Sequence, residues 1–168
     1  MLFCFSILFL LIFLIAPFFI NKSDVSQDTV FETYEEALNW GKNELGKKAV
    51  VVKNIEINNT PNHTNLIFFT TDNFTSLYIS RIITDEASFR YARLSPTFSL
   101  ITENSRSNVA FDVPINVNGK VYYALFGKVD KTHNAYIDEE ELELDVNRIF
   151  IRINHSEKSQ VSFRESIF

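Results

Sequence analysis

Residues 116–129 read NVNGKVYYALFGKV and contain the turn signal that decides the fold. Asn118-Gly119 is a dipeptide favoured by the type I′ turn, because both central residues of that turn need φ > 0. The runs on either side, residues 109–115 and 121–129, are rich in Val, Ile, Phe and Tyr, as strands are. We therefore predict an antiparallel hairpin around this turn.

The same composition recurs along most of the chain, in short runs separated by short polar loops. Strands joined by such short links cannot be parallel, because a parallel crossover needs a dozen or more residues. We therefore predict a mainly antiparallel sheet. Its strands are expected at residues 49–57, 65–71, 76–84, 88–94, 109–115, 121–129, 142–146 and 148–153.

The last two of these runs need a turn between them. The apolar residues of 142–146 share one parity and the isoleucines of 149–153 share the other, so one straight strand would place them on opposite faces. A tight turn at Asn147-Arg148 would bring both sets inward and pair Glu143 with Arg152 across the strands. A bulge is the alternative, because arginine is a poor residue for φ > 0.

Residues 29–46, TVFETYEEALNWGKNELG, have helical periodicity. Thr33 and Glu36 have the spacing of a capping box, with Thr29 and Glu32 as an alternative start, and Gly46 stands where a helix would end. The fold class predicted is α+β, with an N-terminal transmembrane helix and then one amphipathic helix packed on the sheet. The apolar face of that amphipathic helix is expected to contain Phe31, Tyr34, Leu38 and Leu45, with Ala37 and Trp40 beside them.

Residues 1–20 contain no charged side chain. As a helix they would reach ~30 Å, which is the thickness of the hydrocarbon core of a bilayer. The basic flank and Ala-x-Ala site of a signal peptide are absent, so we predict a retained anchor in the lipid bilayer, with cleavage near Ser23 as the alternative. A polar spacer over 21–29 and a single extracytoplasmic domain over 30–168 then follow.

Composition argues against several classes of function. The net charge of −5 makes a nucleic-acid partner unexpected. The single cysteine, Cys4, lies in the apolar run, so the domain has no disulfide and no thiolate metal site. His63, His133 and His155 are far apart, and neither a nucleophile elbow nor a phosphate-binding loop is present. We therefore expect a protein that is not an enzyme and uses no cofactor.

The densest ionisable stretch is DEEELELD at residues 138–145. Hard cations such as Ca²⁺ take several oxygen ligands, so this stretch is the best candidate for a weak cation site. It lacks the Asp-x-Asp-x-Asp-Gly spacing of a calcium loop, and a solvated strand edge that resists aggregation is the alternative. The candidate ligands are Asp138, Glu140, Glu141, Glu143 and Asp145.

Three stretches, FETYEEALNWGKNELG, VYYALFGKV and NRIFIRI, have a layout that resembles a known group of proteins. This is a diffuse group of small, uncharacterised, single-pass envelope proteins of Gram-positive, Bacillus-like bacteria. They have an N-terminal apolar segment, a helix and a β-rich domain. The resemblance implies a single-pass protein of the cell membrane with its domain facing outward. It implies no activity.

These observations lead to two expectations about function. The first is a membrane-anchored, non-enzymatic interaction module that binds another envelope protein or a wall component; an exposed apolar patch would favour it. The second is a small-ligand or cation-binding domain that uses residues 138–145; a closed pocket with converging polar groups would favour that one.

Overall fold

The structure is a computed structural model. The predicted anchor at 1–20, with Cys4, lies outside the residues it describes, as does His155. Within the described part of the chain, no helix is long and apolar enough to cross a membrane. The described residues are 28–46, 49–58, 62–71, 73–101, 108–154 and 159–166.

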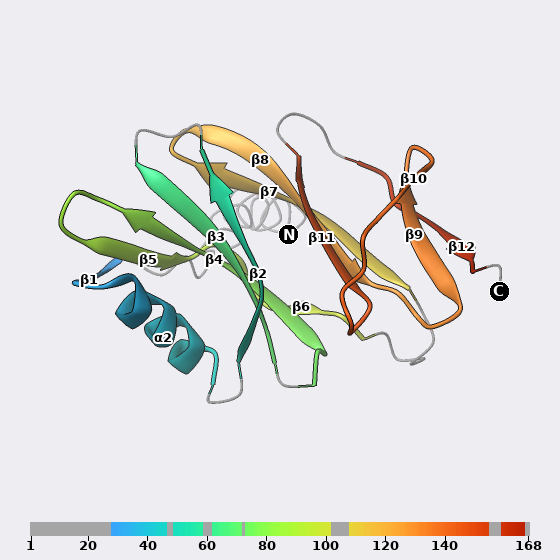
Figure 1. Ribbon diagram of the computed structural model, residues 1–168, viewed down its shortest axis with the longest axis horizontal. Coiled ribbons are helices and arrows are strands. Elements are labelled where there is room, and N and C mark those ends of the chain that lie inside the picture. The colour runs from blue at the N-terminus through green and yellow to red at the C-terminus, as the bar shows by residue number, and fades with distance from the viewer. Residues whose placement is uncertain are drawn as a thin grey trace, which may run out of the picture.

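The described residues form three antiparallel sheets and one helix, α2 (Tyr34–Glu44) (Figure 1). Sheet A contains, in spatial order, β1 (Thr29–Phe31), β5 (Phe89–Arg93), β4 (Ser76–Thr84), β3 (His63–Thr70) and β2 (Val50–Ile57), and β6 (Phe98–Ser99) also pairs with β4. Sheet B contains β11 (Ile149–Asn154), β8 (Lys120–Lys128) and β7 (Val109–Val117). Sheet C contains β10 (Glu140–Glu141), β9 (His133–Ile137) and β12 (Ser162–Glu165).

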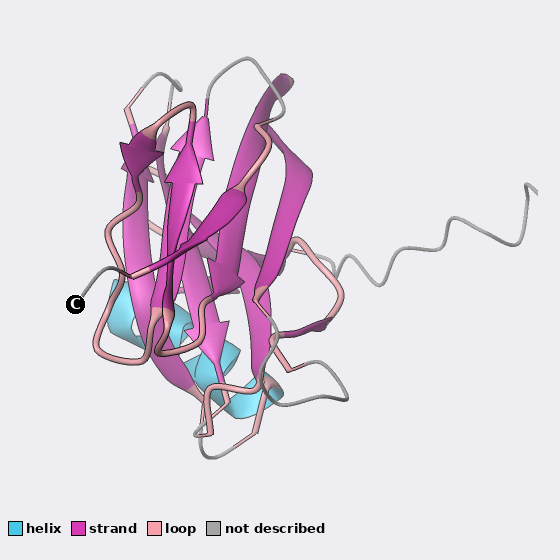
Figure 2. Cartoon of the chain, turned by 90° about the vertical axis from the view of Figure 1, so that its right-hand side faces the viewer, coloured by secondary structure: helices cyan, strands magenta, loops and turns pink. Residues whose placement is uncertain are grey.

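The helix and the sheets are stacked in four layers. Helix α2 packs on one face of sheet A through Ala37, which is buried with Tyr91. The other face of sheet A packs on sheet B, where Phe68 meets Phe126. Sheet C covers the outer face of sheet B, so that it stands in front and α2 behind in Figure 2. The central strands β3, β4 and β8 are therefore buried on both faces over much of their length, which explains their nearly continuous apolar runs.

The turn that decides the fold is confirmed. Asn118 has φ of 51° and Gly119 has φ of 81°, and they join β7 to β8. The predicted strands from 49–57 to 121–129 correspond to β2, β3, β4, β5, β7 and β8, and 148–153 corresponds to β11. The mainly antiparallel, β-rich fold with one short helix is therefore confirmed for the described residues, but their strands form three sheets rather than the single sheet predicted.

The helix begins later than its apolar pattern indicates. Thr33 is the N-cap and forms the predicted capping box with Glu36, and Gly46 follows the last turn with φ of 107°. Phe31, expected on the helix, lies instead in β1 and pairs with Phe89. The residues before an N-cap are extended, and here their backbone groups complete the edge of sheet A. This strand includes Thr29, the last residue of the predicted spacer.

The turn between the last two predicted strands is present, but the strand at 142–146 is not. Arg148 adopts φ of 63° and its N–H donates to the carbonyl of Asp145 at 2.9 Å. Val146, expected inward, is 97% exposed at this turn. Arg152 binds Glu140 at 2.9 Å rather than Glu143.

The reason for this difference lies in two competing contacts. One Asp145 carboxylate oxygen accepts the N–H groups of Asn147 and Ile149, at 2.9 and 2.8 Å, and holds the loop in place. The preceding segment pairs with β9 instead, because the Leu142 N–H donates to the carbonyl of Ala135 at 2.8 Å. Residues 140–142 thereby pair with β9 in sheet C rather than with β11, whereas Asp145 stays bonded to Ile149.

Candidate functional site

One edge of β11 borders two surface hollows. In the described part of the chain β11 pairs only with β8. The Val129 N–H donates to the carbonyl of Arg148 at 3.0 Å, which identifies the even-numbered residues of β11 as those that face β8. Ile149, Ile151 and Ile153 therefore direct their N–H and C=O groups away from sheet B.

Part of this edge is already occupied. Both backbone groups of Ile149 bind Asp145, since the N–H donates to its carboxylate and the carbonyl accepts its N–H at 2.9 Å. The carbonyl of Ile151 accepts the ammonium of Lys53 at 3.5 Å, which is longer than an ordinary hydrogen bond. The Ile151 N–H and both backbone groups of Ile153 have no hydrogen-bond partner among the described residues.

Two adjoining hollows lie along this edge, and we call them the first and the second hollow. They share Lys53, Glu143 and Ile151. The first hollow, of about 280 Å³, is also lined by Glu140, Glu141, Leu142, Phe150 and Arg152. The second hollow, of about 210 Å³, is also lined by Val52, Leu144, Asp145 and Ile149.

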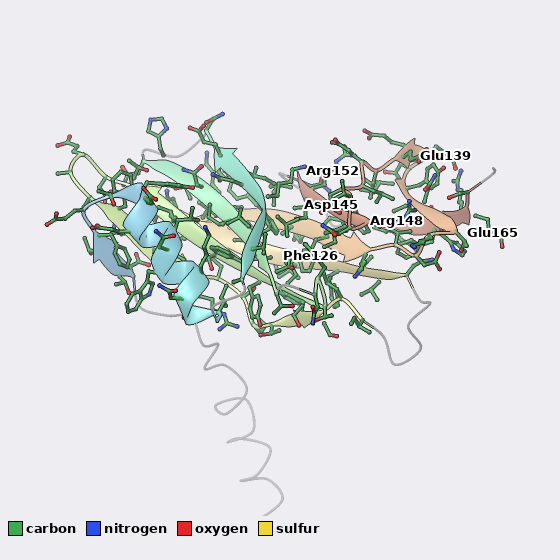
Figure 3. The ribbon with its side chains drawn as sticks, turned by 60° about the horizontal axis from the view of Figure 1, so that its bottom comes forward. Phe126, Glu139, Asp145, Arg148, Arg152 and Glu165 are labelled. Carbon is green, nitrogen blue, oxygen red and sulfur yellow. The ribbon has the colours of Figure 1, made fainter. Side chains whose placement is uncertain are left out.

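The two hollows meet at Ile151 and extend from it toward opposite faces of β11. Phe150 and Arg152, which line the first, point toward sheet C, whereas Ile149 and Ile151 point toward sheet A. Successive residues of a strand alternate between faces, so the hollows flank the strand edge from both sides. In Figure 3, Arg152 and Asp145 lie between sheet A and the small sheet that contains Glu165. The site is thus an open groove between layers and not an enclosed cavity.

The five predicted cation ligands are distributed along this groove and beyond it. Asp138 lies in the turn between β9 and β10 with φ of 46°, and Asp145 is occupied by the loop backbone. Glu140 binds Arg152, and Glu141 accepts the Tyr136 hydroxyl at 3.3 Å. Among the described residues, no three His, Cys, Asp or Glu side chains are placed to hold a metal ion together. The structure therefore does not gather the acidic stretch around one point.

Glu143 differs from its acidic neighbours. It is exposed, it lines both hollows, and its side chain has no hydrogen-bond or ion-pair partner in the described residues. Glu139, by contrast, lies outside the groove and forms two bonds with Arg164, at 2.8 and 2.6 Å. These bonds hold the pKa of Glu139 below its usual value. Glu143 is therefore the carboxylate available to a ligand.

The two described histidines lie outside the groove. His63 contacts Glu56 at 3.1 Å, and His133 contacts Asp130 at 2.9 Å, so each of these histidines has a carboxylate neighbour of its own. The large apolar side chains that are exposed belong to different parts of the described chain. They are Val30, Trp40, Val50, Ile101, Val121 and Val146.

Sequence reasoning found the acidic wall of the groove but missed its other parts. Lys53 belongs to β2 and reaches Ile151 across 98 positions of sequence. Its only local signal is a charged residue in a β-rich run, which is common on exposed strands. The free edge of β11 was missed because the predicted strand at 142–146 would have covered it.

Comparisons of this chain with protein-family models, with curated proteins and with solved structures find no match. The geometry of the groove is therefore the basis for its interpretation. It offers backbone donors and acceptors in strand geometry, with side-chain hollows on both sides. A bound ligand that uses all of these features is an extended polypeptide.

Proposed function

We propose that this protein is a peptide-binding module that captures an extended segment of another protein as an additional strand on β11. The observation that carries the proposal is the pair Ile151 and Ile153, whose backbone groups point away from β8 and have no β-ladder partner among the described residues. In strand addition, main-chain hydrogen bonds supply affinity and pockets for alternate side chains supply specificity. The first and second hollows are placed to receive such side chains.

This geometry favours a polypeptide over a wall glycan, because a sugar chain cannot continue a ladder of backbone hydrogen bonds. It also favours a binding role over an enzymatic one. Each hollow is smaller than the roughly 300 Å³ at which ligand pockets begin, and both are open. If residues 1–20 anchor the chain in the membrane and the domain faces outward, as the sequence predicts, the partner is another protein of the cell envelope.

The alternative of a cation site at residues 138–145 has less support. Glu140, Glu141 and Asp145 already bind protein groups, and a metal ion would have to displace these contacts. Among the described residues no three carboxylates are placed to share one ion, so a cation would not regain these contacts through a common coordination shell.

The test is amide hydrogen exchange by NMR on the full-length chain in detergent micelles. A seven-residue peptide of alternating threonine and valine is the first probe, with lysine–valine and glutamate–valine peptides beside it. Binding is expected to slow exchange at Ile151 and Ile153 but not at Ile149, whose N–H is already bonded. Unchanged exchange at Ile151 and Ile153 with all three peptides would refute strand addition.

A further inference from the structure

We propose that the segment captured on β11 is cationic and alternates basic with apolar residues. This inference rests on the proposed function and adds the chemistry of the partner. An added strand places its side chains alternately on the two faces of sheet B. Alternate side chains of the ligand therefore enter the first and the second hollow, and the difference between the hollows sets the pattern.

The first hollow is suited to a lysine or arginine side chain. Three glutamates and two basic residues, Lys53 and Arg152, line it. Arg152 forms an ion pair with Glu140. Glu143 has no side-chain partner in the described chain, so a basic ligand side chain would supply one. The apolar walls, Leu142 and Phe150, can contact the methylene groups of such a side chain while its charge stays at the acidic rim.

The second hollow is suited to an apolar side chain. Val52, Leu144 and Ile149 supply most of its lining that is not shared with the first hollow. The remaining residue, Asp145, already accepts two backbone N–H groups through one carboxylate oxygen. A valine or isoleucine side chain in this position would extend the apolar contacts between sheets A and B.

Lys53 stands between the two hollows and occupies part of the docking edge. Its ammonium is 3.5 Å from the carbonyl oxygen of Ile151, the acceptor that an incoming strand needs. The residue is exposed and the contact is long, so the side chain can move aside at low energetic cost. Once displaced, the ammonium is replaced at this carbonyl by a backbone N–H of the ligand.

A second copy of the same chain is a poorer occupant. Pairing two β11 edges would bring the rim carboxylates Glu140, Glu141 and Glu143 of both copies together. Like charges directly opposite one another destabilise a strand pair, and charged side chains on an edge are a known protection against self-association. The chain also carries a net charge of −5, which opposes self-association and favours a cationic partner.

The experiment compares three fluorescein-labelled peptides, Lys-Val-Lys-Val-Lys, Thr-Val-Thr-Val-Thr and Glu-Val-Glu-Val-Glu, by anisotropy with the full-length chain in neutral detergent. The cationic peptide is expected to bind at least tenfold more tightly than the neutral one and the acidic peptide to bind most weakly. Glu143→Lys should weaken the cationic peptide at least tenfold and strengthen the acidic one. Glu86→Lys changes charge equally in the exposed β4–β5 loop and should alter each affinity less than twofold.

Several outcomes would overturn the inference. Equal affinity for the cationic and neutral peptides, with Ile151 and Ile153 protected from exchange, would leave strand addition standing but refute the charge pattern. Equal weakening by Glu143→Lys and Glu86→Lys would show attraction to net charge alone. Protection of both amides without peptide, together with dimers in sedimentation, would identify a second copy as the occupant. An unfolding midpoint equal to that of the unaltered protein establishes that a variant is folded. If Glu143→Lys is not folded, Glu143→Gln takes its place.

Discussion

Lys53 on β2 and Ile151 on β11 link the edge strands of two different sheets, with the Lys53 Nζ 3.5 Å from the Ile151 carbonyl oxygen. The opposite side of the same sandwich is filled by Phe98, Phe111 and Phe126, whose ring centroids lie 5.0–5.4 Å apart. One side of the sandwich is therefore packed with aromatic rings, whereas the other is bridged by a flexible side chain. This asymmetry leaves the groove on the β11 side.

Lys53→Met is expected to strengthen binding of the cationic peptide several-fold. The substitution frees the Ile151 carbonyl and removes a like charge from the groove, and one charge at 4 Å in water is worth about 1 kcal/mol. Fluorescence anisotropy measures the change. Lys42→Met, on the last turn of α2, is the control and should have no effect. Weaker binding by Lys53→Met would show that Lys53 contacts the ligand favourably.

Gly41→Ala should destabilise the fold by about 1–3 kcal/mol, the range for overpacked sites. A Cβ at this position would lie 2.6 Å from the ring of Tyr91, which is fully buried and bonded to Ser80 at 2.8 Å. The ring cannot move without breaking that bond. Urea unfolding measures the loss. Asn39→Ala, on the exposed face of the same helix, introduces alanine without this overlap and should cause no loss, because alanine favours the helix more than asparagine. A similar loss in both variants would refute the steric explanation.

Thr33→Ala should cost about 1 kcal/mol of folding free energy, the typical value for loss of an N-cap. The Thr33 hydroxyl accepts the N–H of Glu36 at 3.1 Å, and the Glu36 carboxylate accepts the N–H of Thr33 at 3.2 Å. The matched variant Thr33→Ser keeps the hydroxyl and should retain most of the stability. Equal losses for both variants in urea unfolding would assign the effect to the threonine methyl group.

Acid should destabilise the fold partly through Asp130. Burial raises the pKa of this carboxyl. Hydrogen bonds with Thr132 and His133 lower it by a larger amount, so that the pKa is about 2. Because the folded pKa lies below the ordinary 3.8, the stabilisation is present above pH 4 and is lost as the pH falls toward 2. Asp130→Asn should flatten the fall in urea midpoint over this interval. Glu86→Gln should leave it unchanged, and an ordinary pKa for Asp130 in an NMR titration would refute the prediction.

The elements that sequence could predict are those that depend on neighbouring residues. The Asn118-Gly119 turn and the Thr33 cap each need particular backbone angles or a hydroxyl at one position, which the residue types reveal directly. The long strands are recognisable because runs of β-branched and aromatic residues suit a buried sheet. The runs that became β2, β3 and β4 are of this kind.

The elements that sequence missed depend on distant partners. The strands β9, HNAYI, and β12, SFRE, are short and mixed in polarity, so neither has a clear strand signal. They pair with each other and cover Leu125 and Phe150 on the outer face of sheet B. The adjacent segment 142–146 alternates as a strand does, yet its Leu142 bonds to Ala135 rather than to β11.

The sequence by itself therefore determined an antiparallel β-rich domain, its central hairpin and the capping box of its helix, since local backbone preference and side-chain period specify these features. Only the tertiary structure decided that Ile151 and Ile153 would keep a free edge and that Lys53 and Glu143 would flank it. That outcome depends on competition between two possible partners for residues 140–145. Pairing with β9 is favoured because it buries Leu142 against the outer face of sheet B. The edge of β11 at Ile151 is then left without a neighbouring strand, and the groove lies beside it.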